Sequence, residues 1–247
     1  MTARAHIHHP GIVHLALAVG GFSIGTTEFA SMSLVPFFAP ELGIDIPTAG
    51  HVISAYALGV VFGAPLIAVL FARTPRRTLL VGLMAMFALG NGLSGLAPSY
   101  HWMLLFRFLS GLPHGAYFGV AMLVAASLVP ARQRTQAAAR VLLGLTVATI
   151  IGVPAANWLG LAIGWRWGFG IVALLALLTA LLVRIYAPHH APGEDASPLK
   201  ELGALKNRQV WLTLEQIAKA AGVKANFDEK ERTIDLPLPK GPQHAAH

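Results

Sequence analysis

The chain contains no cysteine among its 247 residues, which excludes disulfide bonds, thiol nucleophiles and thiolate metal sites. Charge is also scarce, because only 12% of the residues are charged, against roughly 25% in a soluble domain. No acidic residue occurs between Asp45 and Glu194. A soluble fold of this size needs a solvated surface, so this gap and a hydrophobic content of 55% indicate a polytopic membrane protein.

The net charge of +7 does not point to a nucleic-acid partner. In the first three quarters of the chain, the basic residues are few and cluster at the ends of apolar segments, where membrane topology places them. The histidines at positions 6, 8 and 9 stand in a short tail without supporting ligands. We therefore expect no nucleic acid, no metal and no cofactor.

Apolar segments of about 20 residues or more predict membrane-spanning helices. We predict an all-α membrane protein in which a cytoplasmic tail, 1–10, precedes a six-helix transmembrane domain, 11–187. The first segment is longer than a signal peptide requires and shows no cleavage site, so we expect it to be retained. The predicted spans are 11–36, 48–71, 78–97, 101–123, 136–160 and 166–187.

The loops between these segments alternate in charge. Loops 37–47 and 97–101 hold no base, and Arg166 in loop 161–166 is the single exception to the alternation. The positive-inside rule then places the N-terminus and the C-terminal tail in the cytoplasm. The basic residues on the cytoplasmic side are Arg73, Arg76, Arg77, Arg132, Arg134, Arg140, Arg184, Lys200, Lys206 and Arg208.

The chain changes character after the sixth span. Residues 188–214 are predicted to form a cytoplasmic linker and the stub of a seventh span, "VWLTL". Residues 215–247 are polar, and their pattern fits either a short helix followed by a hairpin or a disordered tail.

Four stretches carry a family resemblance: "GTTEFASMSLVPFFAPELGIDIPTAGHVISAYALGVVFGAPL", "ARTPRRTLL", "LLFRFLSGLPHGAYFG" and "GLTVATIIGVPAANWLG". Their residues and their order along the chain resemble the N-terminal six-helix half of a major facilitator superfamily transporter. The bacterial proton-coupled drug and arabinose efflux permeases are the most similar group. The resemblance implies one half-bundle of two inverted three-helix repeats in the bacterial inner membrane. It also implies proton-coupled efflux, by antiport, of a small organic solute such as a drug or a sugar.

Two motifs of the resembled family are altered here. Its loop between the second and third helices corresponds to a gating loop with Arg73, Arg76 and Arg77, but Ala72 and Pro75 replace its usual aspartate and glycine. Its fifth-helix antiporter motif corresponds to Gly144, Gly152 and Pro154. A proline loosens a transmembrane helix, so we expect the bend of that motif to be kept.

Glu28 is the only acidic residue in the six predicted spans. At 1.5 Å per residue it lies roughly 22 Å along the first helix, about 8 Å below the outer face. Arg107, on the fourth span, lies about 9–10 Å below the same face. We therefore predict that Glu28 and Arg107 couple proton movement to substrate binding. The alternatives are a static ion pair between them, or a Glu28 carboxylate bonded to backbone groups.

Polar residues of the fourth span fall on one stripe, at i, i+3, i+7 and i+10 from Arg107. We predict that this stripe lines a substrate cavity, although such residues also bridge packed helices. The candidates for the cavity are Tyr56, Asn91, Ser110, His114, Tyr117 and Asn157.

Two other functions compete with transport by this chain. The first is a non-transporting membrane fragment or half-unit that dimerises or binds another membrane protein, because the resembled family has twelve helices. The second is a rhomboid-like protease, since "GLSG" at 92–95 contains Ser94, but the sixth span has no histidine to activate a serine. We expect no enzyme activity. The expected partners are the lipid bilayer, protons and a small-molecule substrate, with a second half or a second copy completing the path.

Overall fold

The computed structural model describes residues 10–188, 226–228 and 233–235 of the chain. Within 10–188, six helical segments are long and apolar enough to cross a membrane, so the predicted all-α fold with six spans is confirmed. Four of the spans are single helices. They are α1 (Pro10–Glu41), α2 (Ile46–Leu70), α3 (Arg76–Gly95) and α8 (Trp165–Tyr186).

The other two spans are interrupted where proline removes a backbone N–H group. The fourth consists of α4 (Tyr100–Gly111) and α5 (Pro113–Ser127), which meet at Leu112. The fifth starts with the 3₁₀ turn η1 (Ala131–Gln133) and α6 (Arg134–Val147). It continues as the π-helical segment η2 (Ala148–Gly152) and α7 (Val153–Ala162). The π-helical segment ends at Gly152, two residues before Pro154, so the backbone irregularity lies in the predicted antiporter motif.

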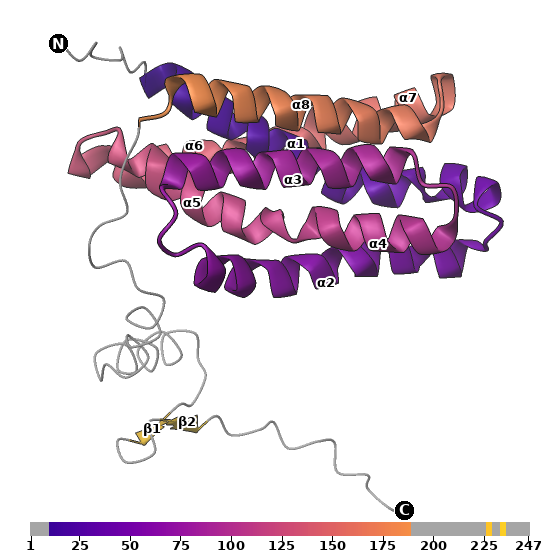
Figure 1. The fold of residues 1–247 in the computed structure, drawn as a ribbon, viewed down its shortest axis with the longest axis horizontal. Helices are drawn as coiled ribbons and strands as arrows, with labels where there is room; N and C mark the ends of the chain where they lie inside the picture. The colour runs from indigo at the N-terminus through magenta and orange to yellow at the C-terminus, as the bar shows by residue number, and fades with distance from the viewer. Residues whose placement is uncertain (1–9, 189–225, 229–232, 236–247) are drawn as a thin grey trace, which may run out of the picture. The chain divides into compact units, whose positions relative to one another are not determined.

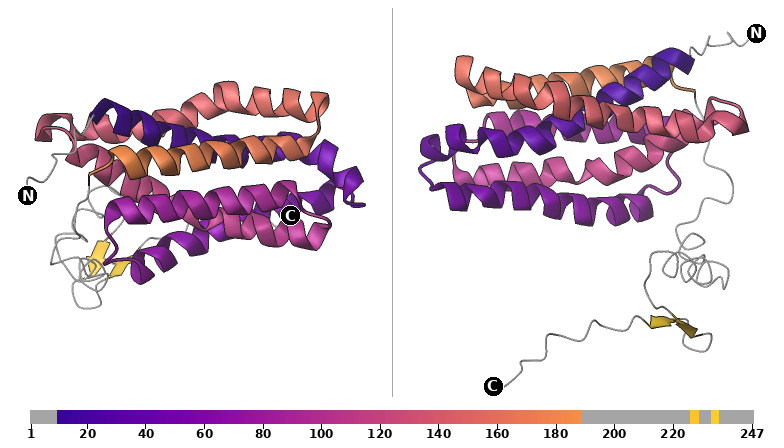
Figure 2. Two further views of the ribbon diagram at one scale, coloured as in Figure 1. Left: turned by 45° about the horizontal axis from the view of Figure 1, so that its top comes forward. Right: turned by 180° about the vertical axis from the view of Figure 1, so that it is seen from behind.

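The helices run side by side along the long axis of the bundle (Figures 1 and 2). Helix α1 packs against both α6 and α8, α3 packs against α8, and α2 packs against α4 and α5. The first and the last spans of the bundle are therefore direct neighbours. The core consists of two clusters of buried apolar side chains, one including Phe87 and Tyr117, the other Phe38 and Trp165.

The C-terminal unit, 194–247, is described only over two short strands. Strands β1 (Asn226–Asp228) and β2 (Thr233–Asp235) pair antiparallel, with Phe227 opposite Ile234. The predicted stub of a seventh span and the predicted short helix lie outside the described residues, as do the histidines at 6, 8 and 9.

The connection between α1 and α2 is shorter than predicted, because α1 continues through Pro36 and Pro40 and ends at Glu41 rather than at 36. Gly43 then turns the chain with a positive φ of 66°, and Asp45 caps α2 by accepting a hydrogen bond from the Thr48 backbone N–H at 2.9 Å. Hydrogen bonds from the Thr48 side chain and backbone lower the pKa of the Asp45 carboxyl.

An ion pair closes the same end of the bundle. Arg166, at the start of α8, donates to the Glu41 carboxylate at the end of α1, and its guanidinium lies 4.3 Å from the centre of the Trp165 ring. Arg166 was the single exception to the charge alternation of the loops. Its charge is offset by Glu41, so this end of the bundle gains no net positive charge from the arginine.

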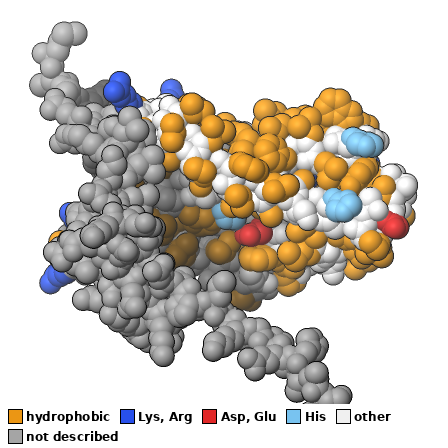
Figure 3. Space-filling model, turned by 90° about the horizontal axis from the view of Figure 1, so that it is seen from below, with side chains coloured by type: hydrophobic (Ala, Val, Ile, Leu, Met, Phe, Trp, Pro, Cys, Tyr) orange, Lys and Arg blue, Asp and Glu red, His pale blue; other side chains and the backbone are white. Residues whose placement is uncertain are grey.

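Hydrophobic side chains are spread over the part of the face that Figure 3 leaves uncovered, and the arginine side chains visible there lie at one end. Large apolar side chains that are more than half exposed include Val61 and Phe62 on α2, and Ile150 and Trp158 on the fifth span. Such a surface suits contact with lipid or with another membrane helix.

Small residues allow the helices to approach closely. A Cβ atom built on Gly144 of α6 would lie 2.0 Å from the Ala18 carbonyl oxygen of α1, and one built on Gly111 would lie 2.2 Å from the Tyr56 carbonyl oxygen. Backbone atoms cannot give way as a flexible side chain can. These contacts agree with the small-residue packing that is typical of membrane helices.

We predict that Gly144→Ala destabilises the bundle by about 1–3 kcal/mol, because the added methyl group must push α1 and α6 apart. Gly82→Ala is the matched control, since a Cβ at Gly82 has no atom within 4 Å. It should leave the stability unchanged or raise it by up to about 1 kcal/mol through better helix propensity. The free energy of unfolding in detergent measures both, and equal stabilities would contradict the close α1–α6 contact.

Candidate functional site

Arg107 on α4 is the centre of the buried polar site, with a side chain that is 0% exposed. Its Nη1 donates to Thr27 Oγ1 of α1 at 3.2 Å and to Asn91 Oδ1 of α3 at 3.3 Å. The Thr27 hydroxyl in turn donates to Asn91 Oδ1 at 2.7 Å. The amide of Asn91 is held by its own helix, since Nδ2 donates to the Phe87 carbonyl at 2.9 Å. One cation therefore joins three helices.

Two aromatic rings lie against the same guanidinium. The Arg107 Cζ atom is 4.3 Å from the centre of the Tyr56 ring on α2 and 5.4 Å from that of Phe169 on α8. Such cation–π contacts attract a desolvated cation. Tyr56 belongs to one apolar cluster and Phe169 to the other, so Arg107 lies where the two halves of the core meet.

The site leaves part of the arginine without a partner. Arg107 Nε is buried, and no described residue accepts a hydrogen bond from it. A buried cation without a carboxylate is costly, and a buried N–H without an acceptor adds to that cost. The arrangement therefore has unused capacity to bind a carboxylate or another acceptor oxygen.

Glu28 follows Thr27 on α1 and is half-buried. It forms no hydrogen bond and no ion pair within the described part of the chain, so its carboxylate oxygens lie more than 4 Å from the Arg107 guanidinium nitrogens. In residues 10–188 the structure shows neither alternative suggested by the sequence, a static pair with Arg107 or a hydrogen bond between the Glu28 carboxylate and the backbone. The acid is therefore next to the network, on the same helix as Thr27, without being fixed by it.

The predicted polar stripe divides at the break between α4 and α5. Tyr117 is fully buried and donates to the Leu17 carbonyl at 2.8 Å, and Ser110 is fully buried and donates to the Arg107 carbonyl at 2.9 Å. Asn91 is also 0% exposed. Lining of an open cavity, which the sequence predicted for these three, is not what this structure shows, because helix packing covers each of them.

His114 remains half-buried and connects to the site through Tyr56. The Tyr56 hydroxyl and His114 Nδ1 are 2.9 Å apart, and the two ring centres are 5.9 Å apart. A continuous path of contacts thus leads from His114 through Tyr56 to Arg107. The structure thus brings Tyr56 of the second span into contact with His114 of the fourth span.

The remaining predicted residues stand apart from this network. Asn157 on α7 is half-buried and makes no hydrogen bond in the described part of the chain. Arg73 lies in the turn before α3, while Arg76 and Arg77 begin that helix. Gly152 packs against Thr26, whose Oγ1 a Cβ would approach to 2.2 Å. Thr26 lines a cavity of about 10 Å³, which is room for about one water molecule.

Sequence reasoning missed Thr27 and Phe169. Thr27 carries a weak signal, because it is a hydroxyl residue directly before the only intramembrane acid. Phe169 carries none, since an aromatic residue in an apolar span is indistinguishable from ordinary core.

Ser94, the residue that suggested a protease, has a different role. It is fully buried, and its hydroxyl donates to the Gly90 carbonyl of the same helix at 2.7 Å. In the described part of the chain no histidine hydrogen-bonds to it. A serine nucleophile needs such a base.

Residues 17–224 match the family profile described as Major Facilitator Superfamily. The inner membrane transport protein YdhP of Escherichia coli is 46% identical over 208 residues, which cover 84% of this chain and 54% of that protein. A chloramphenicol resistance protein of Streptomyces lividans is 38% identical over 202 residues, covering 80% of this chain and 52% of that protein. The chain thus spans about half the length of these curated relatives.

Solved structures show the same fold. The crystal structure of the POT family transporter PepTSo superposes with a TM-score of 0.66 at 15% sequence identity. The superposition covers 86% of this chain and 46% of that one. At this identity the likeness concerns the fold alone.

We predict that Asn91→Leu lowers the free energy of unfolding by about 1–3 kcal/mol, because it leaves Arg107 Nη1 and the Thr27 hydroxyl without the acceptor they share. Asn157→Leu is the control, because Asn157 makes no such bond, and its effect should stay within about 0.5 kcal/mol. Denaturation of the purified protein in detergent measures both. An Asn91 variant as stable as the control would contradict the network.

Proposed function

We infer from the membership of this chain in the major facilitator superfamily that it serves in membrane transport, as a half that contributes the proton-coupling residues. The proposed reaction is efflux of a small organic solute, such as a drug or a sugar, in exchange for protons. The proposed place is the inner membrane, in agreement with the relative named an inner membrane transport protein.

The single observation that carries the proposal is that an acid, Glu28, lies near a buried cation, Arg107, that still has an unused N–H group. Among residues 10–188, Glu28 has no hydrogen-bond or ion-pair partner, and the buried Nε of Arg107 has no acceptor. An ionised Glu28 is attracted to the Arg107 cation. A protonated Glu28 loses that attraction and leaves the arginine to an acceptor oxygen of the substrate. The Glu28 carboxylate and the solute then compete for one cation, so the protonation of Glu28 and the binding of the solute are coupled, as proton-driven transport requires.

Thr27 and Tyr56 keep the arginine at this place during the exchange. They contact its guanidinium from α1 and α2, and neither carries a charge that would neutralise it. Arg107 therefore remains available to an anionic or acceptor group when Glu28 is protonated. The hydrogen bond between Tyr56 and His114 extends the network to α5, where the His114 side chain is half-buried.

We place the basic loops on the cytoplasmic side, with the N-terminus and the C-terminal tail. The basic side chains that Figure 3 shows lie at one end of the bundle, as the positive-inside rule requires of that side. The Glu41–Arg166 pair then lies at the outer face. This orientation makes Glu28 closer to the outside, from which protons enter in antiport.

The path for the solute requires a second bundle. In the resembled fold, the transport site lies between two halves. The described spans bury Arg107 completely, and the cavity lined by Thr26 and Thr27 holds only about 10 Å³, which is too small for a solute. We propose that a second six-helix half, or a second copy of this chain, completes the path.

The test is transport by the protein reconstituted in vesicles with an imposed pH gradient and chloramphenicol as the probe solute. We expect chloramphenicol-dependent proton movement, and we expect Glu28→Gln to abolish it, because glutamine cannot carry a proton. Glu41→Gln is the control on the same helix. It breaks only the exposed ion pair with Arg166, so coupling should survive.

Two outcomes would count against the proposal. A Glu28→Gln variant that retains full coupled transport would remove Glu28 as the proton carrier. A folded chain that moves no protons with chloramphenicol or with a sugar would favour a half-unit that acts only with another membrane protein. A second copy as partner would show as a dimer by light scattering in detergent.

A further inference from the structure

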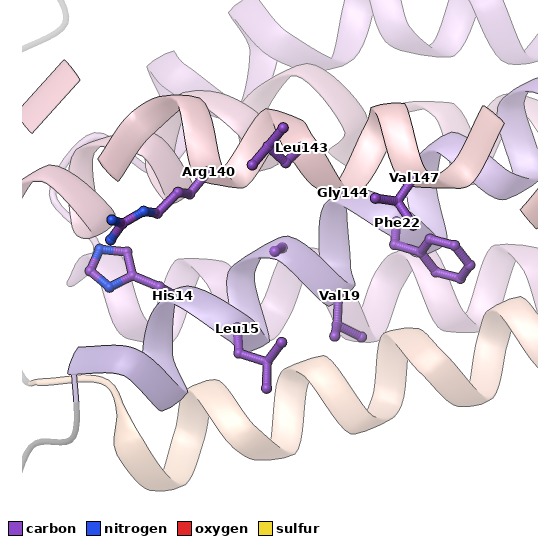
Figure 4. Close-up of a pocket in the computed structure, with 9 residues that line it drawn as sticks. His14, Leu15, Val19, Phe22, Arg140, Leu143, Gly144 and Val147 are labelled. Atoms are coloured by element: carbon purple, nitrogen blue, oxygen red, sulfur yellow. The ribbon is translucent and has the colours of Figure 1, made fainter. Parts of the chain in front are cut away.

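Two cavities adjoin α1, and they differ in character. The larger, of about 400 Å³, lies between α1 and α6 and is lined by His14, Arg140 and apolar side chains such as Val19 (Figure 4). Leu15 and Leu143 in its wall are more than half exposed, so it opens to the surroundings of the bundle. The smaller, of about 10 Å³, lies where α1 meets α7 and α8, and every residue that lines it is buried.

The smaller cavity contains a polar group without a partner. Thr26, which lines it, is 6% exposed, and no described residue forms a hydrogen bond with its Oγ1. A buried hydroxyl without a partner costs free energy. The site therefore favours a small polar ligand that accepts a hydrogen bond from Thr26.

Two further hydroxyl groups belong to residues of the same lining. The Ser31 hydroxyl donates to the Thr27 carbonyl, and the Thr27 hydroxyl donates to Asn91 Oδ1 and accepts from Arg107 Nη1. A hydroxyl oxygen can accept two hydrogen bonds, so Ser31 and Thr27 both have accepting capacity left. A ligand that accepts one hydrogen bond and donates two matches these three hydroxyl groups.

Water fits the cavity better than an ion does. The volume suits about one water molecule, and a buried water needs about two to four polar partners. No carboxylate lines the cavity, and Arg107 Cζ lies 5.4 Å from the ring centre of Phe169, which does line it, so a second cation would be repelled. No cationic side chain lines the cavity, so an anion would lack a counter-charge.

We propose that one water molecule is bound in this cavity, where it accepts a hydrogen bond from the Thr26 hydroxyl and donates to Ser31 and Thr27. Gly152 of the predicted antiporter motif packs against the Thr26 hydroxyl, and Thr27 bonds to Arg107. The water therefore supports α1 at both contacts. This inference concerns the described bundle and does not rest on the proposed transport.

The test compares the stability of the full chain in detergent with that of Thr26→Val, which keeps the branched shape of the side chain and removes the hydroxyl. With water bound, the substitution removes one of its hydrogen bonds. We then expect the equilibrium constant for unfolding to rise about fivefold, the factor for one hydrogen bond. In a dry cavity, the same substitution would remove an unsatisfied group and would leave the stability equal or higher.

A second substitution displaces the water and keeps the Thr26 hydroxyl. Gly168 lines the cavity, and a Cβ atom built on it meets only Leu34 Cδ1, at an ordinary contact distance of 3.4 Å. Gly168→Ala therefore places a methyl group in the cavity without moving a helix. In that background Thr26→Val has no bond to water to lose, so its fivefold cost should disappear.

Gly170→Ala is the matched control on the same helix. A Cβ atom at Gly170 has no atom within 4 Å, and Gly170 does not line the cavity. The cost of Thr26→Val should therefore remain about fivefold in this background, the factor for one hydrogen bond.

Three results would overturn the proposal. A Thr26→Val variant as stable as the wild type would show that the cavity is dry. An equal cost of Thr26→Val with and without Gly168→Ala would show that the hydroxyl bonds elsewhere, for example to its own helix. A crystal structure of the wild type without ordered water beside Thr26 Oγ1 would contradict the proposal directly. None of these measurements involves transport, so their outcome is separate from that of the transport test.

Discussion

The burial of a single guanidinium organises this bundle. Arg107 is fully removed from solvent without a carboxylate in contact, a situation that membrane proteins tolerate only when other groups replace water. Here the replacements come from four other helices: Thr27 on α1, Tyr56 on α2, Asn91 on α3 and Phe169 on α8. Each of these helices must stand at one depth and rotation for the contacts to form. The position of the cation therefore fixes the relative placement of five helices.

The contacts around Arg107 depend on close approach elsewhere. Gly111, one turn after Arg107, lets α4 touch the backbone of α2 at Tyr56, the residue whose ring covers the guanidinium. Gly90, next to Asn91, lets α3 approach Ser110 of α4 in the same way. Small residues beside functional ones thus bring the polar partners within hydrogen-bonding distance. In this bundle, the glycines that allow close helix contacts lie beside, or one turn from, the residues that surround Arg107.

The sequence predicted the architecture well because hydrophobic length and loop charge are strong signals in membrane proteins. It also identified Arg107 and Glu28 as the charges to explain, since charged groups are rare inside apolar spans. It could not find Thr27 or Phe169 as partners, because hydroxyl and aromatic residues are common in such helices. The bond between Tyr56 and His114 joins residues 58 positions apart, and no local pattern encodes it. The ion pair of Glu41 with Arg166 was missed for the same reason.

The packing of α1 against α8 has a consequence for the folding of the chain during synthesis. Among the described helices α1 leaves the ribosome first, yet its main partners, α6 and α8, follow late in this series. Glu41 and Arg166 are 125 residues apart. At 5–20 residues per second, α1 waits roughly 6 to 25 seconds for the helix that completes its surroundings. During the first part of that interval Thr27 lacks its hydrogen-bond partners Asn91 and Arg107, which follow it by 64 and 80 residues, so other groups must shelter the polar face of α1 until α3 and α4 arrive.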